Sequence, residues 1–166
     1  MDKFLCLMAE LDEDVQKGVK ACEEILDAKG FLDKKTRDIP CHFTINSFPV
    51  EEEENLKLVL NEIKDKFKQT EVSFSGIGLF GLRVVYLNPT MNQELLDLYN
   101  LTKEKALNKF DGYSAHATLF IGEDEETLSV IKELSTMQLP AKGVVKDISL
   151  YEFFPTRFIA RVELNK

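Results

Sequence analysis

The sequence consists largely of two copies of one series of predicted elements. In the first copy, an apolar stretch around Leu5 precedes a helical pattern, a polar loop and the motif His42-Phe43-Thr44. In the second copy, an apolar stretch around Arg83 leads through a similar series to the motif His116-Ala117-Thr118. The intervals are similar, at 37 residues from Leu5 to His42 and 33 from Arg83 to His116. This duplication predicts two lobes about a pseudo-twofold axis, with the two histidines facing each other across a cleft.

Hydrophobic periodicity predicts an α+β fold. Strand patterns cover Lys3–Leu11, Cys41–Phe48, Glu71–Gly78, Gly81–Asn88, His116–Ile121, Val144–Phe154 and Arg157–Leu164. Helical patterns cover Asp12–Lys29, Glu51–Lys68, Met91–Lys109 and Glu123–Ser135. We therefore expect a single bilobal domain over residues 1–166. Lobe 1 covers about residues 1–70 plus a closing C-terminal hairpin around Pro155-Thr156, and lobe 2 covers about residues 71–140. Antiparallel sheets should line the central cleft, with the helices outside.

Composition is typical of a domain that folds without covalent cross-links. A chain of 166 residues with 44% hydrophobic residues can bury a sizeable core. The three cysteines, Cys6, Cys22 and Cys41, are odd in number and include no C-x-x-C pair, so neither a disulfide framework nor a zinc site is expected. The apolar runs are shorter than the roughly 18 residues of a membrane span, and the N-terminus lacks a signal-peptide pattern. We expect a cytoplasmic monomer with no membrane partner.

The charge balance limits the possible partners. The net charge is −8 and the pI is about 4.9. Broad binding to DNA or long RNA depends on basic surfaces that displace counterions, so it is not expected here. A small anionic ligand in a locally positive cleft remains compatible with this charge.

The two H-x-T motifs are suited to phosphodiester chemistry. Side chains at i and i+2 of a strand share a face, so His42 projects with Thr44 and His116 with Thr118. An imidazole titrates near 6.5, so one histidine can accept a proton at neutral pH while the other donates one. Threonine hydroxyls can donate hydrogen bonds to phosphate oxygens. The pattern therefore predicts a site for phosphodiester cleavage or formation that needs no metal and no cofactor.

Other motifs support competing functions less well. Cys41 precedes His42, but neighbouring strand residues face opposite ways, so the thiol should point away from the cleft. The run GIGLFG from Gly76 to Gly81 lacks the Lys-Ser/Thr ending of a P-loop and is better explained as a hairpin turn. Ser114 has no carboxylate partner or nucleophile elbow that would indicate a serine hydrolase.

The paired motifs resemble those of the two-histidine phosphoesterase superfamily, which includes 2'-5' RNA ligases and RNA 2',3'-cyclic phosphodiesterases. The resemblance covers nearly the whole chain, including FSGIGLFGLRVVYL before the second lobe and ISLYEFFPTRFIARVEL at the C-terminus. It implies that His42 and His116 are the general acid and base, that Thr44 and Thr118 bind phosphate, and that no metal is needed. Which histidine is the base stays open at this point.

The sequence departs from the superfamily pattern after the second motif. Better characterised members often carry an arginine a few residues further on, whereas this chain continues Leu119-Phe120-Ile121-Gly122 with no basic residue. Arg83 and Arg157 are the candidates for neutralising the phosphate. Tyr151 is a candidate for stacking on a base, with core packing as its competing role.

Three hypotheses follow. The first is a phosphodiesterase that hydrolyses a 2',3'-cyclic phosphate or a related small nucleotide-derived phosphodiester. The second is an RNA-end 2'-5' ligase or cyclic phosphodiesterase on longer RNA, for which Lys34-Lys35-Arg37 is the one compact basic cluster near the first motif. The third is a nucleotide-binding module without turnover.

Overall fold

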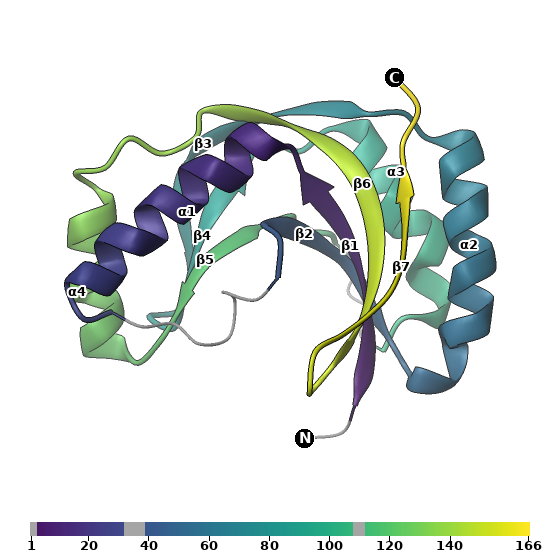
Figure 1. Ribbon diagram of the computed structural model, residues 1–166, viewed down its shortest axis with the longest axis horizontal. Coiled ribbons are helices and arrows are strands. Elements are labelled where there is room, and N and C mark those ends of the chain that lie inside the picture. The colour runs from purple at the N-terminus through teal and green to yellow at the C-terminus, as the bar shows by residue number, and fades with distance from the viewer. Residues whose placement is uncertain (1–2, 32–38, 108–111) are drawn as a thin grey trace.

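The predicted strands form one seven-stranded, strongly bent sheet. The computed structural model describes residues 3–31, 39–107 and 112–166. Its strands are β1 (Phe4–Leu11), β2 (His42–Phe48), β3 (Thr70–Phe80), β4 (Val84–Pro89), β5 (Ala117–Ile121), β6 (Lys142–Phe153) and β7 (Arg157–Glu163). The order is β2-β1-β6-β3-β4-β5, every pair is antiparallel, and β7 lies beside β6. Figure 1 shows that this sheet curves into an arch.

The strand order has the symmetry that the duplication predicts. It reads β2-β1-β6 from one end and β5-β4-β3 from the other, so each strand of one half has a counterpart. The long strands β3 and β6 meet at the centre, where Thr70–Ser73 pair with Lys142–Val145. The rest of β6 pairs with β7 along the same edge, from Asp147 to Glu152. The predicted α+β fold with two pseudo-symmetric lobes and a closing hairpin is therefore confirmed.

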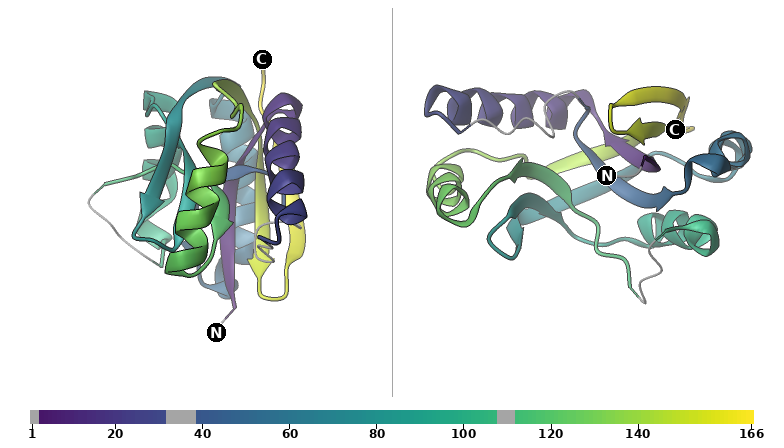
Figure 2. Two further views of the ribbon diagram at one scale, coloured as in Figure 1. Left: turned by 90° about the vertical axis from the view of Figure 1, so that its left-hand side faces the viewer. Right: turned by 90° about the horizontal axis from the view of Figure 1, so that it is seen from below.

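The helices cover the outside of the arch at its two ends. They are α1 (Glu13–Ala28), α2 (Glu53–Lys66), α3 (Gln93–Thr102) and α4 (Asp124–Leu134), with short 3₁₀ turns η1 (Val50–Glu52) and η2 (Lys103–Lys105). α1 packs beside α4 at one end, and α3 lies with α2 at the other (Figures 1 and 2). Each end of the molecule therefore contains one helix from each half of the sequence.

The start of α1 is fixed from two sides. Asp12 accepts a hydrogen bond from Val15 N (3.1 Å), the usual arrangement of an N-cap residue. The other carboxylate oxygen of Asp12 accepts one from Val144 N of β6 (2.6 Å). One side chain therefore caps the helix and attaches it to the central strand.

Strand alternation separates the core from the site. The side chains that face the helices belong to the main core, among them Leu5 and Leu7 of β1, Phe43 of β2 and Leu150 of β6. The opposite, inner face of these strands carries His42 and a smaller cluster comprising Cys6, Met8, Tyr151 and Phe153. The same alternation that buries the core therefore places the first H-x-T motif on the concave side.

The observed elements differ from the expected ones mainly at their ends. The predicted helix Met91–Lys109 is shorter, because Asn92 caps α3 through Leu95 N (2.9 Å) and the helix gives way to η2 after Thr102. Strand β3 runs through most of GIGLFG, and the turn begins only at Gly81, whose φ of 57° suits glycine. The basic cluster Lys34-Lys35-Arg37 lies outside the described residues.

Gly143 of β6 allows α1 to approach the sheet closely. A Cβ added at this position would lie 2.3 Å from Val15 Cγ2. We expect Gly143→Ala to lower the free energy of unfolding by about 1–3 kcal/mol, because the close approach of α1 must be relaxed. Urea denaturation measures this change. The double variant Gly143→Ala/Val15→Ala should lose less than the sum of the single variants, and strict additivity would show that this contact is not the cause.

Candidate active site

The two motifs occupy equivalent places in the two halves. His42 is the first residue of β2, and His116 directly precedes β5. Thr44 and Thr118 follow two residues later on the same strand faces. The structure thus brings together all four residues predicted as catalytic or phosphate-binding. His42 lies 3.4 Å from Thr44, His42 and Thr118 line one cavity, and Thr44 and His116 line another.

The ring of His42 is held in one tautomer by the backbone carbonyl of Pro40, two residues earlier. Its Nδ1 lies 2.7 Å from Pro40 O, and a carbonyl can only accept, so Nδ1 carries the hydrogen. The other nitrogen, Nε2, lies 3.4 Å from Thr44 Oγ1. In the neutral ring, Nε2 is the nitrogen with a lone pair available for a proton.

Burial controls the charge of His42. It lowers the pKa of His42 from its ordinary value of 6.5, and the nearby charge of His116 also lowers it. Glu10, the residue paired with His42 on β1, and the bond to Pro40 O act in the opposite direction. The charge of His116 therefore acts on His42 across the two halves.

His116 repeats the arrangement of His42. Its Nδ1 lies 2.9 Å from Ser114 O, again the carbonyl two residues earlier. The ring meets Phe80 and Tyr86 edge-on, with centroids 4.8 and 5.4 Å apart. The Tyr86 ring lies over Gly78, where an added Cβ would come within 2.4 Å of it. Aromatic packing and a glycine therefore set the position of the second imidazole.

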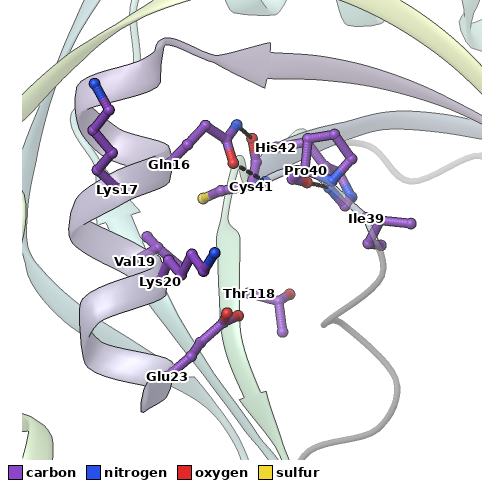
Figure 3. Close-up of a pocket in the computed structure, with 10 residues that line it drawn as sticks. All are labelled: Gln16, Lys17, Val19, Lys20, Glu23, Ile39, Pro40, Cys41, His42 and Thr118. Carbon is purple, nitrogen blue, oxygen red and sulfur yellow. Dashed lines mark hydrogen bonds between the residues drawn. The ribbon is translucent and has the colours of Figure 1, made fainter. Parts of the chain in front are cut away.

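Two contacts between distant segments support the first motif. The Gln16 amide donates to Cys41 O (2.8 Å) and accepts from Cys41 N (2.7 Å), which holds the backbone directly before His42 (Figure 3). Tyr113, three residues before His116, donates its hydroxyl to Thr44 O (2.9 Å). This second contact connects the two motifs directly.

The four motif residues separate two cavities. One, of about 320 Å³, lies between α1 and the start of β2 and is lined by His42 and Thr118 (Figure 3). The other, of about 490 Å³, is lined by Thr44 and His116 and by the rings of Phe80 and Tyr113. Because Nε2 of His42 lies 3.4 Å from Oγ1 of Thr44, the cavities adjoin at this motif. A phosphate at that point would have room for a substituent on either side.

The two arginines considered for phosphate binding have other partners. Arg83 is the last residue of the turn between β3 and β4 and forms an ion pair with Glu123. Arg157 donates to Glu53 (2.6 Å) and Glu152 (2.8 Å). Neither lines either cavity.

Tyr151 lies on the inner face of β6, in the cluster with Cys6, Met8 and Phe153. It is buried, with 7% of its surface exposed, and its ring meets Phe158 edge-on at 5.4 Å. The structure therefore places Tyr151 beside the site as a packed side chain.

Several residues around the site were not anticipated from the sequence. Glu10, 4% exposed, accepts a hydrogen bond from Arg161 (2.9 Å), and both lie on the inner face beside the first motif. Lys20 and Gln16 come from α1, a helix whose pattern indicated only an apolar face. A charged residue within the apolar strand FLCLMAEL was the available signal for Glu10. No local signal marks Gln16 or Lys20, because their role depends on where α1 packs.

The cysteines do not provide a reactive thiol at the site. Cys6, Cys22 and Cys41 are free and buried. Burial raises the pKa of Cys41 to about 12, so its thiol is protonated at neutral pH. Among the described residues, no group of three or more His, Cys, Asp or Glu side chains is arranged to hold a metal ion, and no helix is long and apolar enough to cross a membrane.

Comparison with known proteins identifies the fold. At the level of sequence, no protein-family model and no curated protein matches the chain. Among solved structures, a phosphoesterase crystal structure aligns with a TM-score of 0.66 and 16% identity over 99% of this chain and 100% of that one. Escherichia coli LigT in complex with phosphate aligns with a TM-score of 0.62 and 20% identity over 99% and 98% of the two chains. The complex of LigT with 3'-AMP gives 0.61 and 18% over the full length of both.

The chain has the LigT fold. This confirms the architecture implied by the resemblance to two-histidine phosphoesterases. At these identities the likeness to LigT concerns the fold, so the activity has to be argued from the side chains. In this chain the strands of the two H-x-T motifs, β2 and β5, lie at the two ends of the sheet order.

We expect His42 to titrate below 6.5, since burial is the main influence on its pKa. The chain has two histidines, so a proton NMR titration of the imidazole signals measures this directly. His116→Gln assigns the signals and should move the pKa of His42 upward, because it removes a neighbouring positive charge. Titration of His42 at or above 6.5 in the wild-type protein would contradict the buried environment.

Proposed function

We propose that this protein is a phosphodiesterase that hydrolyses a 2',3'-cyclic phosphate or a related small nucleotide-derived phosphodiester. The observation that carries the proposal is the arrangement of the two motifs. Each imidazole donates its Nδ1 hydrogen to the backbone carbonyl two residues earlier, which leaves Nε2 for chemistry. Each also has a threonine two residues further along the strand. Paired acid and base groups with hydroxyl donors supply what phosphodiester hydrolysis requires.

His42 is assigned the role of general base. Its lowered pKa keeps the ring neutral at pH 7, so Nε2 can take a proton from the attacking water. The water oxygen bonds to phosphorus as one bond between phosphorus and a ribose oxygen breaks. His116 gives a proton from Nε2 to that leaving oxygen. Solvent then returns both histidines to their starting protonation states.

The threonines are assigned to the phosphate. The hydroxyls of Thr44 and Thr118 would donate to the non-bridging oxygens, whose negative charge increases as water attacks. The two imidazoles perform both proton transfers, so the proposed reaction uses no metal and no cofactor.

The cavities support a nucleotide-derived substrate. The larger one carries the rings of Phe80 and Tyr113 and can receive a base or nucleoside. LigT, with the same fold, has been crystallised with phosphate and with 3'-AMP, which are ligands of the same chemical kind. The net charge of −8 favours a small substrate over long RNA.

We expect the purified protein to hydrolyse at least one 2',3'-cyclic nucleotide in the presence of EDTA, as followed by chromatography of the products. His42→Ala and His116→Ala should each lower kcat by roughly 10²–10⁴-fold, because each removes one proton transfer. In the wild type, kcat/KM should fall on the acid side as pH drops through the lowered pKa of His42.

A short RNA that ends in a 2',3'-cyclic phosphate should be tested beside the mononucleotides. Faster turnover of the RNA would favour the RNA-end enzyme over the small-substrate enzyme. Full activity in either alanine variant, or loss of activity on adding EDTA, would contradict the mechanism. Binding of a nucleotide by folded protein without turnover would identify a binding module.

Thr44→Val and Thr118→Val should each lower kcat by roughly 10²-fold while leaving the fold intact, because valine replaces only the hydroxyl by a methyl group. Thr136→Val, in the exposed turn after α4, is the matched control and should keep wild-type kinetics. Steady-state kinetics checks all three variants. Equal activity of the site variants and the control would remove the threonines from the mechanism.

A further inference from the structure

The cavity beside α1 carries a cation that the proposed reaction does not use. Three α1 residues that line this cavity, Gln16, Lys20 and Glu23, are spaced four and three positions apart, so they form one stripe along the helix. The Gln16 amide is already bonded to the backbone of Cys41. Lys17 also lines the cavity, but its ammonium extends away from His42 in Figure 3, so Lys20 supplies the positive charge that faces the cavity.

Lys20 is oriented toward the cavity. Figure 3 shows its ammonium group extending from α1 toward the side on which Thr118 lies. Within the described ranges, no carboxylate forms an ion pair with Lys20. Lys17, one turn earlier, extends away from His42 in the same view and pairs with Glu13 at 3.6 Å. The two lysines thus provide an internal comparison on one helix.

Glu23 lines the same cavity but does not cancel this charge. It lies three residues beyond Lys20 and already has an interaction of its own. In Figure 3 its carboxylate extends to the same side of α1 as the Lys20 ammonium, toward Thr118, so it disfavours an anion at that end of the cavity. An anionic group would therefore lie on the other side of Lys20, toward His42.

The cavity is longer than the reacting group requires. The stripe from Gln16 to Glu23 extends over seven residues, or about 10 Å of helix. His42 lies beside the Gln16 end of this stripe, and Thr118 lies beside Lys20 and Glu23 (Figure 3). With the reacting phosphate at His42, the remaining length can hold a part of the substrate that does not react.

We propose that this cavity is a subsite for a second phosphate and that Lys20 binds it. The inference rests on the proposed function of the same site, and it specifies the substrate class as phosphodiesters that carry a further phosphate close to the reacting one. A charge-assisted hydrogen bond from an ammonium is a strong contact for such a group. It also provides a local attraction for anions on a protein of net charge −8.

Calorimetric titration tests the subsite without turnover. Inorganic pyrophosphate, which has two linked phosphates, should bind the wild-type protein more tightly than inorganic phosphate at equal ionic strength. Lys20→Gln should weaken pyrophosphate binding roughly tenfold, which corresponds to one lost charged contact, and should change phosphate binding little. Lys20→Arg should retain most of the affinity, and Lys17→Gln, the matched control, should leave it unchanged.

The titration separates the subsite from the catalytic proposal. Lys20-dependent pyrophosphate binding supports the subsite even in a protein that hydrolyses no tested diester. Equal affinity for the two anions, or equal weakening by Lys17→Gln and Lys20→Gln, overturns it.

In a protein with turnover, kinetics gives a second test. Lys20→Gln should raise KM for adenosine 2',3'-cyclic phosphate bearing a 5'-phosphate roughly tenfold and leave KM for the substrate without the 5'-phosphate unchanged. An equal effect on both substrates would overturn the assignment, because it would place Lys20 on the reacting phosphate.

Discussion

The pairing of β3 with β6 is the interaction on which the site depends. β6 carries β1 and β2 on its other edge, while β3 carries β4 and β5, so the short ladder between Thr70–Ser73 and Lys142–Val145 joins the strand of His42 to the strand of His116. Antiparallel pairing fixes register, since a slip of one residue would turn every side chain to the other face. The relative position of the two imidazoles is therefore set by a hydrogen-bonded sheet.

The helices strengthen this connection because each end of the molecule combines helices from both halves. α1 leaves β1 and packs beside α4, where Lys29 pairs with Glu133 at 2.6 Å. On the opposite side, α3 packs against β2. Asn46 of β2 donates to the backbone of Tyr99 (3.1 Å) and to Thr102 (2.7 Å). Opening the site would thus require breaking core contacts as well as the central ladder.

Charge around the first motif is divided between two sides. Burial keeps His42 neutral, while Glu10 on the neighbouring strand opposes that effect and is itself paired with Arg161. The α1 side contributes Lys20 across the cavity. A partly buried base flanked by a paired carboxylate, with a cation on the opposite wall, favours an anionic substrate without making the histidine cationic.

The sequence by itself determined the duplicated order of elements and the four residues of the motifs. Both depend on local patterns, namely the alternation of a strand, the period of a helix and the spacing of His and Thr, and these patterns also placed most element boundaries within a few residues. The third predicted helix was too long at both ends, because capping by Asn92 at its start and the change to η2 after Thr102 depend on side-chain contacts. Only the tertiary structure decided that Arg83 and Arg157 pair with carboxylates, and that Gln16, Glu10 and Lys20 surround His42. Those placements arise from the crossing of α1 over β6 and from strand register, which join residues far apart in the chain and leave no local pattern to read.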